Sequence, residues 1–364
     1  MPVASEEMAS RLRERIVRGR LKPGIRLPAR LDLIGELETC AGTLQAAVDQ
    51  LVREGFLQVG PRKKGTRVAE HPPHLSRYRL LFPYGPDDWG QFWHALEAAA
   101  RQRASPTREF LPFYGLAGHR DIEEYRTLVN EVQTRRVAGL IFASSAGEFA
   151  GTPLLDHAGL PRVAIADDGQ LPGMPKVHVD LDSFMAQAIG CLVAQGRRRI
   201  ALLCASSATG VADKYRRAMA KRGLRCRTAW EQCASQRNPL AARHVVELLM
   251  QPGRPERPDG LIVADDNLLT AASNGLVDAG VQVPEDLQVV AATNFPNLVP
   301  PAVPVTRIGY DIPALLDLLV LRLEQVRRGE RAPEVTLMPA TLEPGETAAR
   351  PSPPSVRHRK KEEP

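Results

Sequence analysis

Residues 19–28 read Gly19-Arg20-Leu21-Lys22-Pro23-Gly24-Ile25-Arg26-Leu27-Pro28, a run in which glycine and proline interrupt a region of helical periodicity. Before the run, apolar residues recur every four positions at Met8, Leu12 and Ile16, which predicts a first helix. Ser5 is the predicted N-cap of that helix and Gly19 its stop. The run is therefore expected to connect the first helix to a second one.

The sequence after the run predicts two more helices and a hairpin. The second helix has an inner stripe of Leu33, Ile34 and Leu37, and a turn over residues 38–42 follows it. The third helix ends at Gly55, and its inward residues are Leu44, Ala47, Val48 and Leu51. Residues 56–59 and 66–68 are predicted strands around a basic tip. Three helices and a basic hairpin predict an α+β winged helix-turn-helix domain over residues 1–69.

The order of these glycines, prolines and leucines resembles the GntR family of bacterial transcription regulators. The matching positions are Gly19, Pro23-Gly24, Leu27-Pro28, Leu33, Leu37, Thr43, Leu51, Glu54-Gly55 and Gly65-Thr66-x-Val68. The resemblance implies that the third helix enters the major groove of DNA and that the wing tip touches the adjacent minor groove.

The start of the third helix departs from the family pattern. GntR proteins usually read Ser-Arg-x-Thr-Val-Arg, whereas this chain reads Cys40-Ala41-Gly42-Thr43-Leu44-Gln45. Cys40 is a poorer cap, and the loss of two arginines predicts a lower affinity for DNA. Gln45 is expected to read adenine, and Thr43 a phosphate or a thymine methyl group. The predicted DNA-contacting residues are Arg26, Arg30, Thr39, Gly42, Thr43, Gln45, Arg62, Lys63, Lys64 and Gly65.

The charge distribution favours a nucleic-acid-binding head on a neutral body. Residues 1–70 hold 13 Lys and Arg against 9 Asp and Glu, whereas residues 71–343 hold 30 of each kind. The five cysteines are scattered without a zinc-ligand pattern, so reduced thiols in a cytosol are expected. The start of the chain lacks the apolar core of a signal peptide, and no apolar run is long enough to predict a membrane helix.

Strand and helix patterns alternate from Tyr78 onward. The nearly all-apolar stretch 137–143 is typical of a buried parallel strand, and a second set of alternating elements begins at Val177. This order predicts an α/β body with two lobes, each built on a doubly wound parallel sheet. The predicted division is an extended linker with solvated histidines over 70–76 and a body over 77–343. The body is expected to split near residue 170, with crossovers near 293–310, and residues 344–364 are expected to be disordered.

Two stretches of the body resemble the effector domain of the LacI/GalR family. They are Val179-Asp180 with Gln195-Gly196-Arg197-Arg198-Arg199-Ile200, and residues 258–290 with Pro258-Asp259-Gly260, Asp265-Asp266 and Val283-Pro284-Glu285-Asp286-Leu287. The resemblance implies a periplasmic-binding-protein-like fold that pairs as a dimer and closes on a small molecule, typically a sugar.

The expected effector site lies at the carboxyl ends of the strands. The arginine with which the family holds sugar hydroxyls is Val211 here, so a different effector or none is also considered. Predicted effector-binding residues are Tyr84, Trp89, Ser144, Ser145, Asp265, Asp266 and Asn294. Structural roles are left open for several of them: Trp89 packing on its lobe, the two serines shaping a turn, and Asp266 capping a helix.

The sequence as a whole predicts a cytoplasmic, dimeric, ligand-responsive transcription regulator, and we expect it to repress transcription. The expected partners are double-stranded DNA with a palindromic operator and a small-molecule effector, with no membrane, cofactor or metal. An enzyme is not expected, because the chain has no glycine-rich phosphate loop, nucleophile elbow or metal-ligand cluster. The alternative is a two-lobed sensor or interaction protein that has lost sequence-specific DNA binding.

Overall fold

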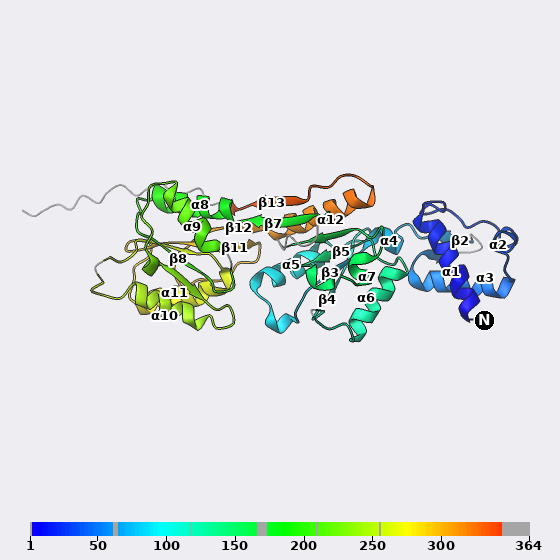
Figure 1. Ribbon diagram of the computed structural model, residues 1–364, viewed down its shortest axis with the longest axis horizontal. Coiled ribbons are helices and arrows are strands. Elements are labelled where there is room, and N and C mark those ends of the chain that lie inside the picture. Colours follow the sequence, from blue (N-terminus) through cyan, green and yellow to red (C-terminus); the bar gives the residue numbers. More distant parts are fainter. Residues whose placement is uncertain are drawn as a thin grey trace, which may run out of the picture. The chain divides into compact units, whose positions relative to one another are not determined.

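The computed structural model describes residues 2–60, 65–116, 118–165, 173–208, 210–254 and 256–343 (Figure 1). The chain forms two compact units. Unit 1 contains the chain up to His178 and the segment Ile312–Leu337, and unit 2 contains Val179–Asp311 and the segment that starts at Met338. Among the described residues, no helix has the length and apolar character needed to cross a membrane.

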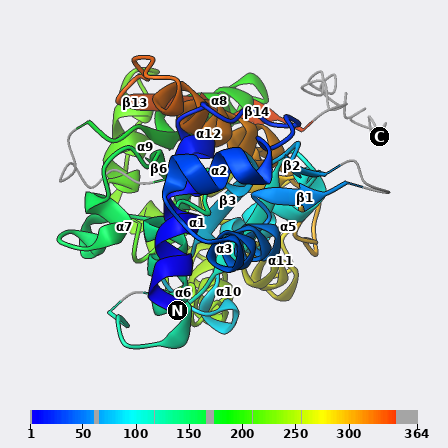
Figure 2. The same ribbon diagram turned by 90° about the vertical axis from the view of Figure 1, so that its right-hand side faces the viewer.

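The head of unit 1 is a winged helix-turn-helix, as predicted. It consists of α1 (Pro2–Val17), α2 (Arg30–Leu37), α3 (Ala41–Glu54) and the antiparallel strands β1 (Leu57–Val59) and β2 (Thr66–Val68) (Figure 2). The loop before α2 joins the hairpin, since Leu27 N donates to Thr66 O at 3.0 Å and Val68 N donates to Ile25 O at 2.9 Å.

The predicted stop of α3 is confirmed, because Gly55 takes up a φ of +89° directly after Glu54. The predicted cap at Ser5 is wrong. Helix α1 begins at Pro2, and proline is well placed in a first turn because its missing N–H would have no helical partner there. Ser5 therefore lies inside the helix.

The segment after the hairpin differs from the predicted extended linker. Pro72 is extended, but Pro73–Ser76 form the short helix α4, in which Ser76 Oγ donates to Pro72 O. His71 is exposed as predicted. His74 is not solvated: its ring stacks on Phe56 of the head, with 5.8 Å between ring centroids.

The remainder of unit 1 is a six-stranded sheet in the order β13-β7-β6-β5-β3-β4. Its strands are β3 (Arg77–Leu81), β4 (Glu109–Phe113), β5 (Gly139–Phe142), β6 (Arg162–Ala164), β7 (Lys176–Asp180) and β13 (Val335–Pro339). Helices α5 (Gln91–Arg103) and α12 (Ile312–Arg327) pack together. Helices α6 (Glu123–Gln133) and α7 (Pro153–Asp156) also contact each other. All four residues of β5 are buried, as predicted for a parallel strand between helical layers.

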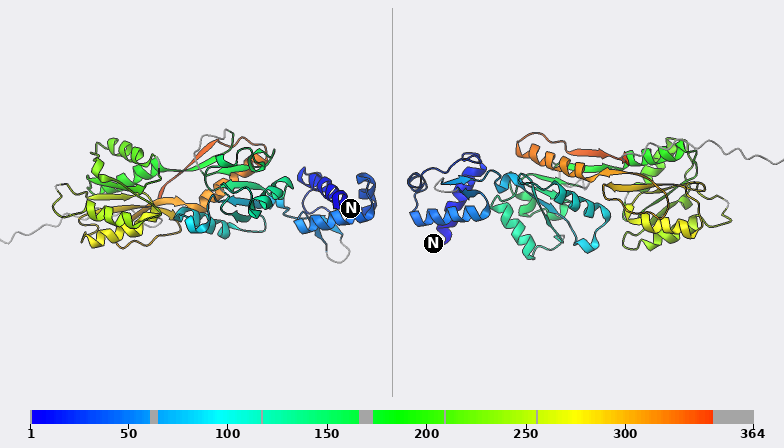
Figure 3. Two further views of the ribbon diagram at one scale, coloured as in Figure 1. Left: turned by 60° about the horizontal axis from the view of Figure 1, so that its bottom comes forward. Right: turned by 180° about the vertical axis from the view of Figure 1, so that it is seen from behind.

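Unit 2 repeats this plan with the strand order β14-β12-β11-β10-β8-β9. The strands are β8 (Ile200–Ala205), β9 (Glu231–Ala234), β10 (Gly260–Val263), β11 (Gln288–Phe295), β12 (Thr306–Asp311) and β14 (Thr341–Leu342). The helices are α8 (Leu181–Ala194), α9 (Val211–Ala220), α10 (Leu240–Leu249) and α11 (Leu269–Asp278). Figure 3 shows α10 and α11 on one face of this sheet and α8 and α9 on the other.

One strand of unit 2 is displaced from its predicted position. The stretch 226–230, Cys-Arg-Thr-Ala-Trp, is a possible strand by its sequence, but Thr228–Trp230 form a 3₁₀ turn and the strand follows at Glu231. Pairing with β8 fixes this position, since Cys233 lies opposite Cys204 and Ala234 opposite Ala205.

Candidate functional site

The N-terminal end of α3 is open, as DNA contact requires. Cys40 precedes the helix with extended dihedral angles, and its side chain makes no capping bond to a backbone N–H. Its Sγ lies 3.1 Å from Thr43 Oγ1 instead, and this hydrogen bond lowers the pKa of Cys40. Gly42 is exposed, and a Cβ there would meet no atom within 4 Å. Thr39 is half-buried beside it. The exposed N-terminal end of the helix is therefore accessible to an anion such as phosphate.

A groove of about 510 Å³ runs between α3, the start of α2 and the wing strand β2. Four of the predicted DNA-contacting residues line it: Arg26, Arg30, Gln45 and Gly65. Leu27, Pro28 and Thr66, which are not among the predicted DNA-contacting residues, also line it. The predicted Thr39, Gly42 and Thr43 belong to the neighbouring end of α3. Arg62, Lys63 and Lys64 lie outside the described residues.

Local contacts hold the polar side chains of this groove. Arg26 lies across Gly65, where a Cβ would be only 2.6 Å from Arg26 Nε and where φ is +73°, so the wing requires glycine here. Arg30 Nη2 donates to Ala41 O at 2.8 Å. Gln45 Nε2 donates to Asp49 Oδ1 at 2.8 Å. That last bond uses one of the two amide N–H groups of Gln45, so the second N–H and Oε1 can still contact a base edge.

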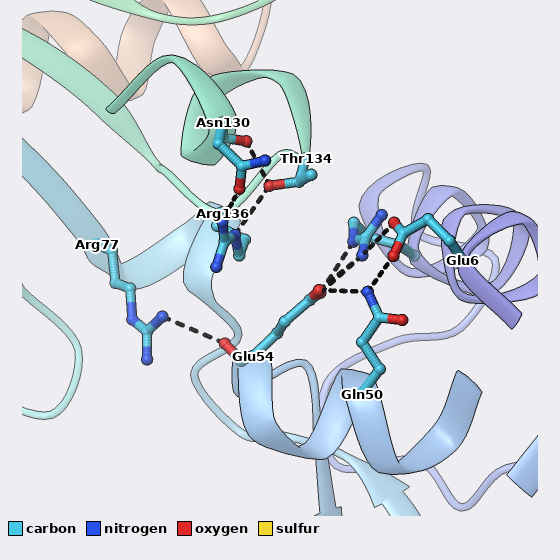
Figure 4. A network of polar contacts seen from close by, with 8 residues as sticks. Glu6, Gln50, Glu54, Arg77, Asn130, Thr134 and Arg136 are labelled. Atoms are coloured by element: carbon cyan, nitrogen blue, oxygen red, sulfur yellow. Dashed lines mark hydrogen bonds and ion pairs between the residues drawn. The ribbon is translucent and has the colours of Figure 1, made fainter. Parts of the chain in front are cut away.

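The carboxyl end of α3 is anchored on both sides (Figure 4). Arg13 of α1 forms a bidentate ion pair with Glu54, at 2.8 Å for the shortest N–O distance, and both side chains are almost fully buried. Gln50 also donates to Glu54 at 2.9 Å. From the first strand of the adjoining lobe, Arg77 donates to the backbone carbonyl of Glu54 at 3.2 Å and pairs with Glu109 at 2.9 Å.

His74 lies at the same junction. Its Nδ1 is buried without a hydrogen-bond partner in the structure. Burial, with a smaller contribution from the guanidinium of Arg327, lowers the pKa of His74 to about 4. Arg327 of α12 in turn donates to the carbonyl of Leu75. Helix α4 thus contacts Phe56 of the head through His74 and α12 of the first lobe through Leu75.

The carboxyl ends of β3 and β4 carry a cluster of aromatic rings, which we call the aromatic wall. It consists of the predicted Tyr84 and Trp89 together with Phe82, Trp93 and Tyr114, which the sequence analysis missed. Phe82 is fully buried, with ring centroids 4.2 Å from Trp89 and 5.9 Å from Tyr114. Trp93 lies in the first turn of α5, whereas Trp89 precedes that helix with extended dihedral angles, so no helical period in the sequence predicts their contact.

The two predicted serines follow β5 of the same lobe. Ser145 Oγ accepts a hydrogen bond from Gly147 N at 3.1 Å, so it shapes the turn there, and Ser144 is half-buried beside it. The turn role considered from sequence is therefore present for Ser145. Trp93 Nε1 donates to Ala143 O at 3.0 Å, which places the aromatic wall against the end of β5.

In unit 2, Asp266 and Asn294 are hydrogen-bonded to each other, whereas the third predicted residue, Asp265, is bonded to Asn267 and Gln236. Asp266 is buried and accepts a hydrogen bond from Asn294 Nδ2 at 2.7 Å. Asp265 caps the turn that follows β10, because its carboxylate accepts from Asn267 N at 2.9 Å, and Gln236 donates to its other oxygen at 2.7 Å. The capping role considered for Asp266 thus belongs to Asp265.

Burial, reinforced by the charge of Asp265, raises the pKa of Asp266 to about 7. Val211, at the position where the resembled family has an arginine, is buried at the start of α9. None of the seven predicted effector residues is a cation. The strand ends therefore offer aromatic surface, carboxyl groups and an amide.

Comparisons with known proteins agree with this architecture. Residues 4–68 match the family described as "Bacterial regulatory proteins, gntR family", and residues 189–348 match "Periplasmic binding protein-like domain". Catabolite control protein A of Priestia megaterium is 25% identical over 172 residues. The matched stretch covers 46% of this chain and about half, 51%, of that protein.

Solved structures show the same fold in the body of the chain. A LacI family transcriptional regulator from Lactobacillus casei with bound sucrose has a TM-score of 0.55 at 18% identity, covering 74% of this chain and 98% of that one. The lactose repressor bound to the anti-inducer ONPF also has a TM-score of 0.55 at 18% identity, covering 73% and 97%. Residues 4–68 thus match a gntR-family model and residues 189–348 a periplasmic binding protein-like model, and the body shares its fold with these LacI-type structures.

Proposed function

We propose that the protein is a ligand-responsive repressor that binds a palindromic operator as a homodimer. The observation that carries this proposal is the groove in which Arg26, Arg30, Gln45 and Gly65 meet between α3 and β2. Two guanidinium groups, a base-reading amide and a glycine that lets the wing approach DNA closely are suited to duplex DNA. We assign residues 1–69 to DNA binding, 70–76 to the connection and 77–343 to effector binding and dimerisation.

The seven predicted strand-end residues are proposed to bind the effector. A sucrose-bound relative and the lactose repressor support a small-molecule effector for this fold. Effector binding would favour one conformation of the body and so change how well the paired heads match an operator. The contacts of Arg77 and Arg327 at the end of the head provide a direct physical connection for this coupling.

Catalysis is not part of the proposed function, and a cytoplasmic location with no cofactor is proposed with it. The strongest candidate for acid chemistry is Asp266, whose pKa is raised to about 7. That carboxyl already accepts a hydrogen bond from Asn294, and Asp265 is held by Asn267 and Gln236. Such mutually satisfied groups suit ligand binding and support of the lobe better than proton transfer.

The test is selection of bound duplexes from a randomised pool with the full-length protein. The selected sequences should converge on two inverted half-sites. Gln45→Ala should relax the preference at one base pair in each half-site, because an amide pairing contributes about 1–3 kcal/mol of discrimination. A pool that fails to converge would contradict operator recognition and would support the interaction-protein alternative.

A further inference from the structure

The aromatic wall concentrates a residue class that is scarce in this chain. The protein has 18 Phe, Trp and Tyr residues in 364, and five of them form this cluster. Only Phe82 is fully buried; Trp89, Trp93 and Tyr114 are half-buried, and the side chain of Tyr84 is 49% exposed. A cluster that served only as core would bury these rings, so the remaining surface is available to a ligand.

The polar edges of three residues of the wall, Trp89, Trp93 and Tyr114, are already occupied. Trp89 Nε1 donates to Tyr84 O at 2.9 Å, and Trp93 Nε1 donates to Ala143 O at 3.0 Å. Tyr114 Oη donates to Glu97 at 2.6 Å. Because these three donors are satisfied within the lobe, the wall offers a ligand mainly π faces, with the exposed Tyr84 hydroxyl as its remaining polar group. A sugar, which needs partners for its hydroxyl groups, is poorly served by such a surface.

The electrostatics of the wall favour a positive charge. Ring faces carry negative potential, and Glu97 adds a carboxylate beside Tyr114. Burial opposes ionisation of Glu97, but hydrogen bonds from Tyr114 and Arg101 outweigh it and lower the pKa of Glu97. The Arg101 side chain that pairs with Glu97 is 73% exposed, so solvent screens its charge. Burial and the Glu97 carboxylate raise the pKa of Tyr114 to about 12, which keeps this hydroxyl a neutral donor.

We propose that the aromatic wall binds an organic cation, a methylated or alkyl ammonium group packed against the faces of Tyr84, Trp89 and Trp93. Aromatic surfaces recognise such groups through cation–π attraction, which is strongest with tryptophan. The inference rests on the proposed function, in which this strand end belongs to the effector site. It gives the effector a chemical class: an amine or a quaternary ammonium compound rather than a neutral sugar.

Tryptophan fluorescence of the full-length protein tests the proposal directly. The chain has three tryptophans, two of them in the wall, and the third, Trp230, belongs to unit 2, where it lies beneath the guanidinium of Arg227. Trp230→Phe therefore leaves an emission signal that comes from the wall alone. The probes are choline, tetramethylammonium, n-butylammonium and glucose, with 3,3-dimethylbutan-1-ol and butan-1-ol as uncharged counterparts.

We expect at least one cation to bind at least tenfold more tightly than its uncharged counterpart. Tyr84→Leu should weaken that binding about fivefold, whereas Tyr84→Phe should retain it, because the ring face and not the hydroxyl makes the contact. Tyr84 is half exposed, so neither variant threatens the fold of the lobe. Equal binding of a cation and its counterpart, tighter binding of glucose, or no binding of any cation would overturn the proposal.

DNA binding by the same preparations separates this inference from the proposed function. Loss of cation selectivity with operator binding intact refutes the organic cation alone. Loss of operator binding refutes the regulator, whatever the wall binds. A cation that binds the wall and shifts operator affinity supports both.

Discussion

Replacement of Glu54 by alanine should lower the stability of the head by an amount that the burial of its ion pair allows us to estimate. The variant removes the ion-pair partner of Arg13. The side chain of Arg13 is 4% exposed and the side chain of Glu54 is 11% exposed. Removing one partner of a buried ion pair typically costs about 3–5 kcal/mol, because the remaining charge stays buried without compensation. Glu6 lies 3.7 Å from Arg13 and Phe56 stacks beneath its guanidinium at 5.8 Å, so partial compensation is available. We therefore expect the lower end of the range, about 3 kcal/mol.

Hydrogen exchange of the backbone amides of α1 and α3 measures this cost in the full-length protein. A loss of about 3 kcal/mol corresponds to exchange roughly 150-fold faster in both helices. The matched control is Glu36→Ala, which breaks the Arg15–Glu36 pair; those side chains are 26% and 50% exposed. An exposed pair contributes about 1 kcal/mol or less, so exchange should rise no more than about fivefold.

Two results would refute this reasoning. Exchange in Glu54→Ala within about fivefold of the unmodified protein would mean that the buried pair contributes no more than a surface pair. Equal effects of the two variants would mean that burial does not decide the cost. Joint replacement with Arg13→Met and Glu54→Leu should restore protection, because an apolar pair of similar volume leaves no buried charge.

Three further predictions concern other parts of the molecule. Arg77→Ala removes the hydrogen bond to the Glu54 carbonyl. A hydrogen bond from a charged donor contributes about 1.5 kcal/mol, so proteolytic cleavage between residues 69 and 76 should become about tenfold faster. The raised pKa of Asp266 means that the folded state binds its proton more tightly than the unfolded state, so stability should fall as pH rises from about 4 to about 7, by up to about 1.4 kcal/mol per pH unit. Thermal unfolding at pH 5 and pH 8 should show a smaller difference in Asp266→Asn. Gly309→Ala places a Cβ 1.7 Å from the carbonyl oxygen of Thr293 in the neighbouring strand. Chemical denaturation should therefore show that the free energy of unfolding is lower by about 3 kcal/mol. An unchanged midpoint of denaturation would contradict the clash.

Apolar periodicity predicted most elements, because burial imposes it. Leu33 and Leu37 on α2, and Leu44 and Leu51 on α3, are all buried where the spacing placed them. The errors arose where local preference and long-range contact disagree. The strand expected over residues 226–230 is displaced to 231–234 because its hydrogen bonds with β8, and not its own composition, fix its register.

The connection after the hairpin shows the same limit. Paired prolines at positions 72 and 73 favour an extended chain, yet proline is also a good first residue of a helix, and α4 begins at Pro73. Which preference prevails depends on what the segment packs against. The stacking of His74 on Phe56 joins residues whose contact no sequence period predicts.

The candidate sites were predicted in part for a similar reason. Tyr84 and Trp89 were identified from their position after a strand, but Tyr114 follows a different strand and joins them only through the pairing of β3 with β4. Asp49, which holds Gln45, was within reach of sequence reasoning because the two residues are four apart on one helix.

Binding of the full-length protein to DNA upstream of its own gene, measured by fluorescence anisotropy across a salt series, tests the central claim most directly. Five predicted cations per head, Arg26, Arg30, Arg62, Lys63 and Lys64, predict a log–log salt slope of about −4.5 for one head and about −9 for a pair. Replacing the last three by glutamine should make the slope less steep by about 3 per head. Sequence-selective binding with that change would establish the operator-binding function. Weak binding that is indifferent to sequence and to the three substitutions would contradict it.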